Sequence, residues 1–216
     1  MLRLIRLVAA LALTLASGAA FPEPPTTRAQ ALAALEAAET DQRAEAVAWF
    51  AEHGRMEDTR RLAARLRDES PLVRVTAEQG LWLLWSRSGD ETVDRLLARG
   101  IEQMQAGGYD EAIATFAEVI RRRPEFAEGW NKRATAYFLA GKLEASAADC
   151  DEVLKRNPQH FGALSGYGLI RFRQEDYESA IAWWQRALAV NPNMEGVEAN
   201  LAHARTLLRG RRARTI

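Results

Sequence analysis

The stretch GYDEAIATFAEVIRRRP, residues 108–124, is followed by two related stretches, KLEASAADCDEVLKRNP at 142–158 and DYESAIAWWQRALAVNP at 176–192. Each of the three ends on a proline, and successive prolines are 34 residues apart. Proline cannot continue the interior of a helix because it lacks the backbone N–H donor. We therefore expect each stretch to form a helix that ends just before its proline, within a repeating unit of fixed length.

Side chains of similar size occupy equivalent positions ahead of each proline. The positions 24 and 12 residues before it are always small, whereas those 28 and eight residues before it are mainly large and apolar. Small residues let the two antiparallel helices of a unit approach closely, and large ones fill the seam between units. The small set is Gly100, Ala134, Gly168, Ala112, Ser146 and Ala180, and the large set is Leu96, Trp130, Leu164, Phe116, Cys150 and Trp184.

These features resemble the tetratricopeptide repeat family. The runs Gly108–Ala112 and Asp176–Ala180 look like the family's turn between the two helices of a unit, while Ser146 and Cys150 make the middle unit the weakest match. The resemblance implies an all-α fold, a right-handed α-solenoid of helix-turn-helix repeats whose curvature makes a concave face. The three implied units are 93–126, 127–160 and 161–194.

The chain beyond the last repeat continues at helical spacing. Apolar residues recur as far as Leu208, which predicts a capping helix over 195–210 that closes the solenoid. Residues 211–216 are expected to form a basic tail. A solvated terminus explains that tail, with contact to an anionic lipid or polyanion as the alternative.

The region 28–92, ahead of the repeats, is also predicted to be helical. Breakers at 40–41, 53–54, 70–71 and 88–90 divide it into about four short helices. Arg43 and Arg74 begin similar patterns 31 residues apart, and Asp68–Arg74 is similar to the turn of HEAT-like repeats, where an arginine braces the loop. Pro71 suits a helix start, because its missing N–H would be unpaired there. A non-repetitive helical cap is the alternative.

The first twenty residues have the three parts of a secretory signal peptide. Arg3 and Arg6 precede the apolar run 7–16, and the small residues 17–20 follow. The uncharged stretch is too short to span a bilayer, although an uncleaved helix anchored in the inner membrane remains the alternative. Residues 21–27 form a proline-rich linker.

The predicted location is the periplasm or the medium of a bacterium. Arginine outnumbers lysine 26 to 3, which is typical of a GC-rich genome. Removing the signal peptide leaves a net charge of −2 and no further segment that would span a membrane.

Composition and spacing argue against several classes of function. A formal net charge of zero provides no basic field for nucleic acid. The single cysteine excludes an intramolecular disulfide, and the three histidines lie in no metal-ligand spacing. No catalytic pattern is recognisable, so we expect neither an enzyme nor a cofactor or metal.

The resemblance places a peptide-binding groove on the first helix of each unit. In the family, residues of these helices that face away from the second helix contact the ligand. Asn131 would hold a peptide backbone amide and Arg173 a carboxylate. The corresponding positions are Leu97, Ile101, Met104, Gln105, Asn131, Thr135, Phe138, Leu139, Ser165, Leu169, Phe172 and Arg173.

The expected partner is a protein segment with two or three apolar anchors. The chaperone-binding subfamily clamps a C-terminal carboxylate with lysines and asparagines, but Leu97 and Ile101 occupy two of the clamp positions here. The sequence thus predicts an exported, non-catalytic interaction adaptor. A structural protein of the cell envelope that assembles through self-association is the alternative.

Overall fold

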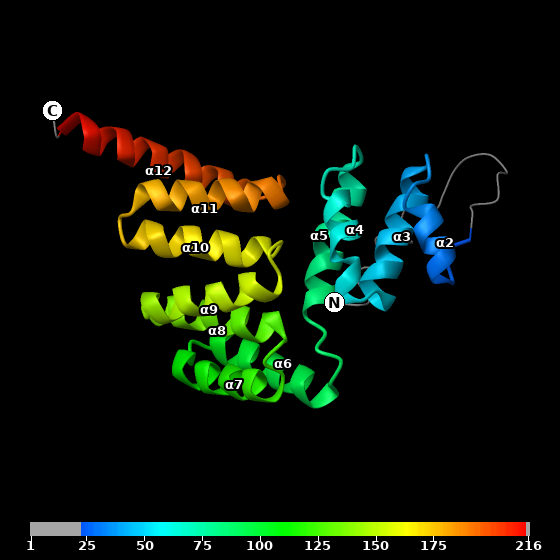
Figure 1. Cartoon of the computed structure of the whole chain (residues 1–216), viewed down its shortest axis with the longest axis horizontal. Helices are drawn as coiled ribbons and strands as arrows, with labels where there is room; N and C mark the ends of the chain where they lie inside the picture. The colour runs from blue at the N-terminus through cyan, green and yellow to red at the C-terminus, as the bar shows by residue number, and fades with distance from the viewer. Residues whose placement is uncertain (1–22, 215–216) are drawn as a thin grey trace.

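A computed structural model describes residues 23–214, and the predicted signal peptide at 1–20 lies outside the described residues. Over the described range the fold is all-α, as predicted: eleven α-helices and one short 3-10 helix follow one another with no strand (Figure 1). Helices α6 to α12 form one stack, and α2 to α5 form a second group beside it.

The second group contains the four α-helices that the breakers predict. Thr27 caps the first of them by accepting a hydrogen bond from the backbone N–H of Gln30, and Pro71 occupies the first turn of the last. Their apolar faces meet in a common core that includes Phe50 and Leu62. The helices are α2 (Arg28–Ala34), α3 (Thr40–His53), α4 (Thr59–Arg65) and α5 (Pro71–Trp85), with the 3-10 helix at Met56–Asp58.

Two arginines brace the loops of this group. Arg43 donates to the backbone carbonyls of Ala37 and Ala38 and forms a bidentate ion pair with Asp68 at 2.9 and 2.8 Å. Arg74 donates to the carbonyls of Asp68 and Glu69 at 2.9 and 3.0 Å. Both arginines therefore make the loop contacts that the HEAT-like resemblance implies, whereas membership in that class stays a prediction.

The stack is built from antiparallel helix pairs. Each second helix ends two residues before one of the three periodic prolines, as predicted. Glycine is required where the helices touch, because a β-carbon on Gly100 would lie 2.4 Å from the Phe116 ring and one on Gly168 would lie 2.3 Å from Nε1 of Trp184. The pairs are α6 (Glu91–Gln105) with α7 (Tyr109–Arg122), α8 (Ala127–Leu139) with α9 (Leu143–Arg156), and α10 (Phe161–Arg173) with α11 (Tyr177–Val190).

The turn inside each pair needs a left-handed residue. Gly107 and Gly141 have φ values of 83° and 76°, and the equivalent residue of the third pair is Glu175 at 56°. A side chain in this conformation is strained. Arg211 holds the turn by donating to the Glu175 carbonyl at 3.1 Å and to its carboxylate at 2.9 Å.

The last helix, α12 (Glu195–Arg214), is longer than the predicted cap at 195–210. Arg211 and Arg212 form ion pairs with Glu175 and Glu178, near the start of α11. The C-terminal end of α12 is therefore held against the repeats. Part of the expected basic tail is therefore helical.

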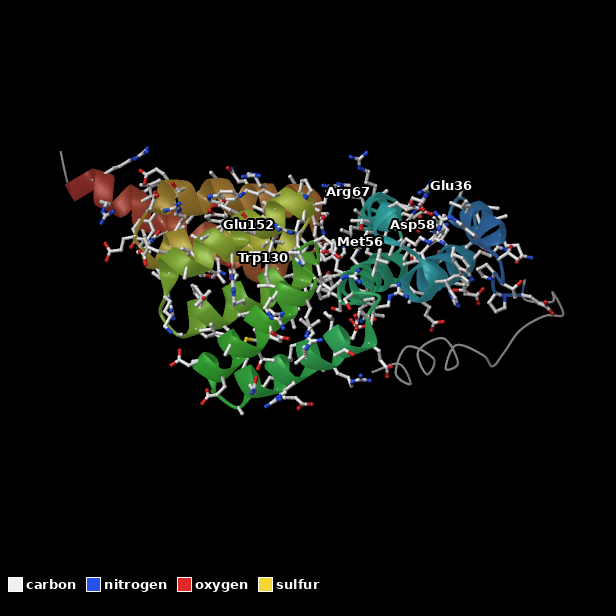
Figure 2. The ribbon with its side chains drawn as sticks, turned by 60° about the horizontal axis from the view of Figure 1, so that its bottom comes forward. Glu36, Met56, Asp58, Arg67, Trp130 and Glu152 are labelled. Carbon is white, nitrogen blue, oxygen red and sulfur yellow. The ribbon has the colours of Figure 1, made fainter. Side chains whose placement is uncertain are left out.

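The two groups of helices are joined along α5. The indoles of Trp82 and Trp85 pack against Phe161 with ring centroids 5.1 Å away, so Phe161 belongs to the core of the second group. Figure 2 shows Arg67 at the junction, where it donates to the carbonyls of Ala189 and Val190 at the end of α11. These contacts fix the N-terminal helices against one edge of the repeats.

Candidate functional site

The predicted groove positions form a row on each of α6, α8 and α10, spaced by four residues. Exposure rises along every row toward the C-terminal end of its helix. Gln105, Leu139 and Arg173, the last residue of each row, are all exposed, and Leu139 has 43% of its surface accessible. The rows are Leu97, Ile101 and Gln105; Asn131, Thr135 and Leu139; and Ser165, Leu169 and Arg173.

Two of the predicted residues lie at the closed end of the rows. Leu97 is 3% exposed and packs in the core between α6 and α7, near Phe116. Asn131 is 7% exposed, and its amide donates to the Glu128 carboxylate at 3.0 Å. Neither side chain presents a surface to a ligand in this structure, so we leave both out of the proposed contact surface.

The exposed end of the three rows is mainly apolar. Met104, Phe138 and Phe172 are partly buried and lie one residue before the exposed end of each row. The Arg173 guanidinium stacks over the Phe138 ring at 4.3 Å and donates to the Phe138 carbonyl at 3.1 Å. This contact links the second and third pairs and places a cation beside the apolar strip.

A buried polar cluster lies behind the closed end, and sequence reasoning missed it. Glu128 and His160 are almost fully inaccessible, with Nε2 of His160 3.0 Å from the Glu128 carboxylate. The backbone N–H of Ala163 donates to Nδ1 of His160, so this assignment places the imidazole proton on Nε2, where it is donated to Glu128. The Lys132 ammonium lies 3.0 Å from the other Glu128 oxygen.

Electrostatics keep the Glu128 carboxylate ionised. Burial raises the pKa of Glu128, but the hydrogen bond from His160 and the charge of Lys132 outweigh it, so the pKa of Glu128 lies below its ordinary value. The Trp85 ring stacks on His160 with centroids 4.5 Å apart. The cluster is a structural joint between α5, α8 and α10.

Trp82 covers the repeats near the buried end of the rows. Its ring lies 5.7 Å from the Lys132 ammonium, and a β-carbon on Gly162 would lie 2.5 Å from its edge. Lys132 and Gly162 belong to the first halves of α8 and α10, so the N-terminal helices cover that part of the repeats. No sequence periodicity predicts this contact.

Within residues 23–214 no cluster of three His, Cys, Asp or Glu side chains could hold a metal ion. Burial raises the pKa of the Cys150 thiol to about 12, which leaves it protonated and unreactive. Its neighbour Asp149 is held by Arg133 at 2.7 and 2.8 Å. None of the helices in this range is long and apolar enough to cross a membrane.

Comparison with known proteins identifies the repeats. Residues 97–159 and 147–195 match the family profile "Tetratricopeptide repeat", which supports repeats of this type in that part of the chain. The matched residues do not include 28–92.

Curated relatives match part of the chain. A TPR repeat-containing protein of Rhizobium etli is 30% identical over 126 residues, which are 58% of this chain and 62% of that protein. The Hsp70-Hsp90 organizing protein of Triticum aestivum is 28% identical over 95 residues, 44% of this chain and 16% of that protein. The chain thus spans less than two thirds of the length of either relative.

Solved structures support the same fold. The first TPR of Spaghetti (RPAP3) bound to the HSP90 peptide SRMEEVD has a TM-score of 0.52 and 27% identity, covering 54% of this chain and 92% of that one. The Sgt2 TPR domain from Aspergillus fumigatus has a TM-score of 0.55 and 22% identity, covering 57% and 83%. The fold is therefore an α-solenoid of the tetratricopeptide type.

Proposed function

We propose that the tetratricopeptide repeats of this chain bind a peptide segment of a partner protein in the concave groove of α6, α8 and α10, and that the protein acts as an exported, non-catalytic adaptor. The supporting observation is an apolar strip across the three helices, in which the equivalent positions 104, 138 and 172 are all large and apolar. The strip consists of Ile101, Met104, Phe138, Leu139, Leu169 and Phe172, all partly or fully accessible.

The chemistry of the groove favours apolar anchors over a terminal carboxylate. The related first TPR of Spaghetti is bound to an acidic peptide that ends in EEVD. In this chain Leu97 and Ile101 replace two clamp residues, and the Lys132 ammonium is engaged by Glu128 beneath Trp82. A peptide would therefore bind at the open end of the rows, with its apolar side chains on the strip.

The expected affinity is modest. Burying two or three apolar side chains contributes roughly 1.5–3 kcal/mol each. Three such anchors supply at most about 9 kcal/mol before the cost of association and of ordering the peptide, so we expect a dissociation constant in the micromolar range or weaker. Such values suit an adaptor that exchanges partners.

Export rests on the N-terminal sequence. The charged start, apolar core and small-residue end of residues 1–20 support a periplasmic or secreted protein. Fractionation of cells that produce the tagged chain, with N-terminal sequencing of the recovered protein, tests this part separately. Recovery in the cytoplasm with residues 1–20 intact would contradict export.

Site-specific cross-linking tests the groove. A photoreactive residue replaces Leu139 in the groove, and in a matched control it replaces Ala148, which is exposed on the second helix of the same pair. A partner captured from envelope extracts through position 139 but not 148 would be identified by mass spectrometry. Its contacting segment would then be titrated as a synthetic peptide.

Matched charge substitutions complete the test. The pair Thr135→Arg and Leu139→Glu alters exposed groove positions, whereas Ala148→Arg and Ala182→Glu introduces the same side chains on exposed positions of second helices. We expect the groove variant to lose peptide binding at least tenfold and the control to retain it. Equal binding by both variants would refute the groove as the site.

A further inference from the structure

The outer flank of α12 lies at one end of the stack of repeats. Figure 1 shows α12 at the end of the stack, with no described helix beyond it. Val197, Leu201 and Ala204 are buried against the preceding repeat. Beside them, between α11 and α12, is an open cavity of about 350 Å³ lined by Gln185, Leu188, Glu198, Leu201, Ala202 and Arg205.

Four charged side chains line this flank in a definite order. At about 100° per residue, Glu195, Glu198, Arg205 and Arg209 fall within about 80° of arc on α12. All four are exposed. Among the described residues none of them has an ion-pair partner, whereas the neighbouring Arg212 pairs with Glu178. The flank therefore presents two acidic residues followed by two basic ones.

The helix dipole accounts for only part of this pattern. Acidic residues are favourable in the first turn and basic residues in the last. That effect acts along the helix axis and does not select a side of the helix. The flank on the other side of the helix carries residues without a charged group, such as Gly196, Ala199 and Leu207, over the same turns. A face-specific order of charges indicates a face-specific partner.

We propose that this flank of α12 pairs with the same flank of a second copy of the chain, the two helices running antiparallel about a two-fold axis near Ala202. Such an axis places Glu195 opposite Arg209 of the second copy and Glu198 opposite Arg205 of the second copy, because both pairs are centred on residue 201 or 202. Each ion pair then occurs twice, as an isologous interface requires.

The side chains at the centre suit close approach. Ala202 is the smallest residue of the flank and lies where the helices would cross, which permits a short interaxial distance. Leu188 and Leu201 line the adjacent cavity and provide the apolar contact. The cavity is then the site that the α12 helix of the second copy covers.

The interface is small and therefore reversible. A 20-residue helix is about 30 Å long, and one flank of it buries less than the roughly 800 Å² per partner of a standard stable interface. Because exposed ion pairs are screened by salt, dimerisation should weaken as ionic strength rises.

Charge reversal provides the test. One variant carries Glu195→Arg with Glu198→Arg, and the other carries Arg205→Glu with Arg209→Glu. Sedimentation velocity over a dilution series of the purified protein should show a reversible dimer for the parent and at least a tenfold weaker one for each variant. An equimolar mixture of the two variants should form a heterodimer, because the reversed charges are complementary across the axis.

The quadruple variant is the matched control. It reverses all four charges, keeps the net charge of the parent and should regain the homodimer. Circular dichroism of every variant checks that the exposed substitutions leave the helices intact. A parent that stays monomeric, single-pair variants that still dimerise, or a mixture that forms no heterodimer would each overturn the proposal. The groove residues lie on other helices, so this result does not depend on peptide binding.

Discussion

Gly166 and Gly168 lie two residues apart on α10, and replacing each by alanine should change stability in opposite directions. Alanine in a helix interior is more favourable than glycine by about 0.5–1 kcal/mol, and both variants gain this amount. They differ in what the added methyl group meets.

At Gly168 the new β-carbon would lie 2.3, 2.4 and 2.6 Å from three atoms of the Trp184 indole. Trp184 is fully buried and donates to the Ser165 carbonyl at 3.2 Å, so its ring cannot swing away without losing that bond. Overpacking costs about 1–3 kcal/mol, and contacts this short place Gly168→Ala at the upper end, about 2–3 kcal/mol. After the helix-propensity gain, the net expectation is a loss of about 1–2 kcal/mol.

At Gly166 the nearest atom would be the Cys150 sulfur at 3.9 Å, an ordinary van der Waals distance. The expected result is a gain of about 0.5–1 kcal/mol. Urea denaturation followed by circular dichroism measures both free energies of unfolding, with the parent as reference. The reasoning is refuted if the two variants shift stability in the same direction or if Gly168→Ala is neutral.

Three further predictions concern single residues. Glu175→Gly should raise the free energy of unfolding by about 1 kcal/mol, because it removes the left-handed strain at φ 56°. This value already allows for the small contribution of the exposed ion pair with Arg211, which the variant loses. A lower free energy of unfolding in urea denaturation would contradict this. Glu128→Gln should cost about 2–3 kcal/mol at pH 7, because it removes the buried partner of Lys132 and His160. The pKa of Glu128 is lower in the folded than in the unfolded protein, so the carboxylate stabilises the fold above about pH 4.3. This stabilisation is lost as the pH falls through the folded pKa. In acid titrations the difference in stability between parent and variant should therefore shrink over that window. Cys150 should resist alkylation at pH 8 in the folded protein and react once urea unfolds it, since burial raises its pKa to about 12; rapid labelling of the native state would show an accessible thiol.

The helices of this protein were predictable because their signals are local. Pro124, Pro158 and Pro192 mark the ends of helices, and the small residues that face large ones recur with the same period. The breakers in 28–92 likewise act within a turn or two of their own positions. Signals of this kind need no knowledge of distant contacts.

The covered end of the rows was not predictable, because it depends on contacts between residues far apart in the sequence. The contact of Trp82 with Phe161 joins residues about 80 positions apart in sequence, one in a region without the 34-residue period. The resemblance to the family assigned Asn131 to ligand binding, whereas in the fold its side-chain amide donates a hydrogen bond to the neighbouring Glu128 carboxylate. Only the packing of α5 on the repeats shows which end of the groove stays open.

The two proposed interactions should respond differently to salt, and the structure gives the reason. Arg173 is the exposed cation among the predicted groove positions, and its guanidinium already lies on Phe138. Peptide binding on the apolar strip should therefore change little with ionic strength, since apolar burial supplies most of its free energy. The α12 contact depends on exposed ion pairs such as Glu198 with Arg205 of the second copy, which salt screens over about 10 Å at 0.1 M. Raising the salt concentration should thus separate the copies while leaving each groove able to bind its peptide, and loss of both interactions together would mean that the groove too depends on charge.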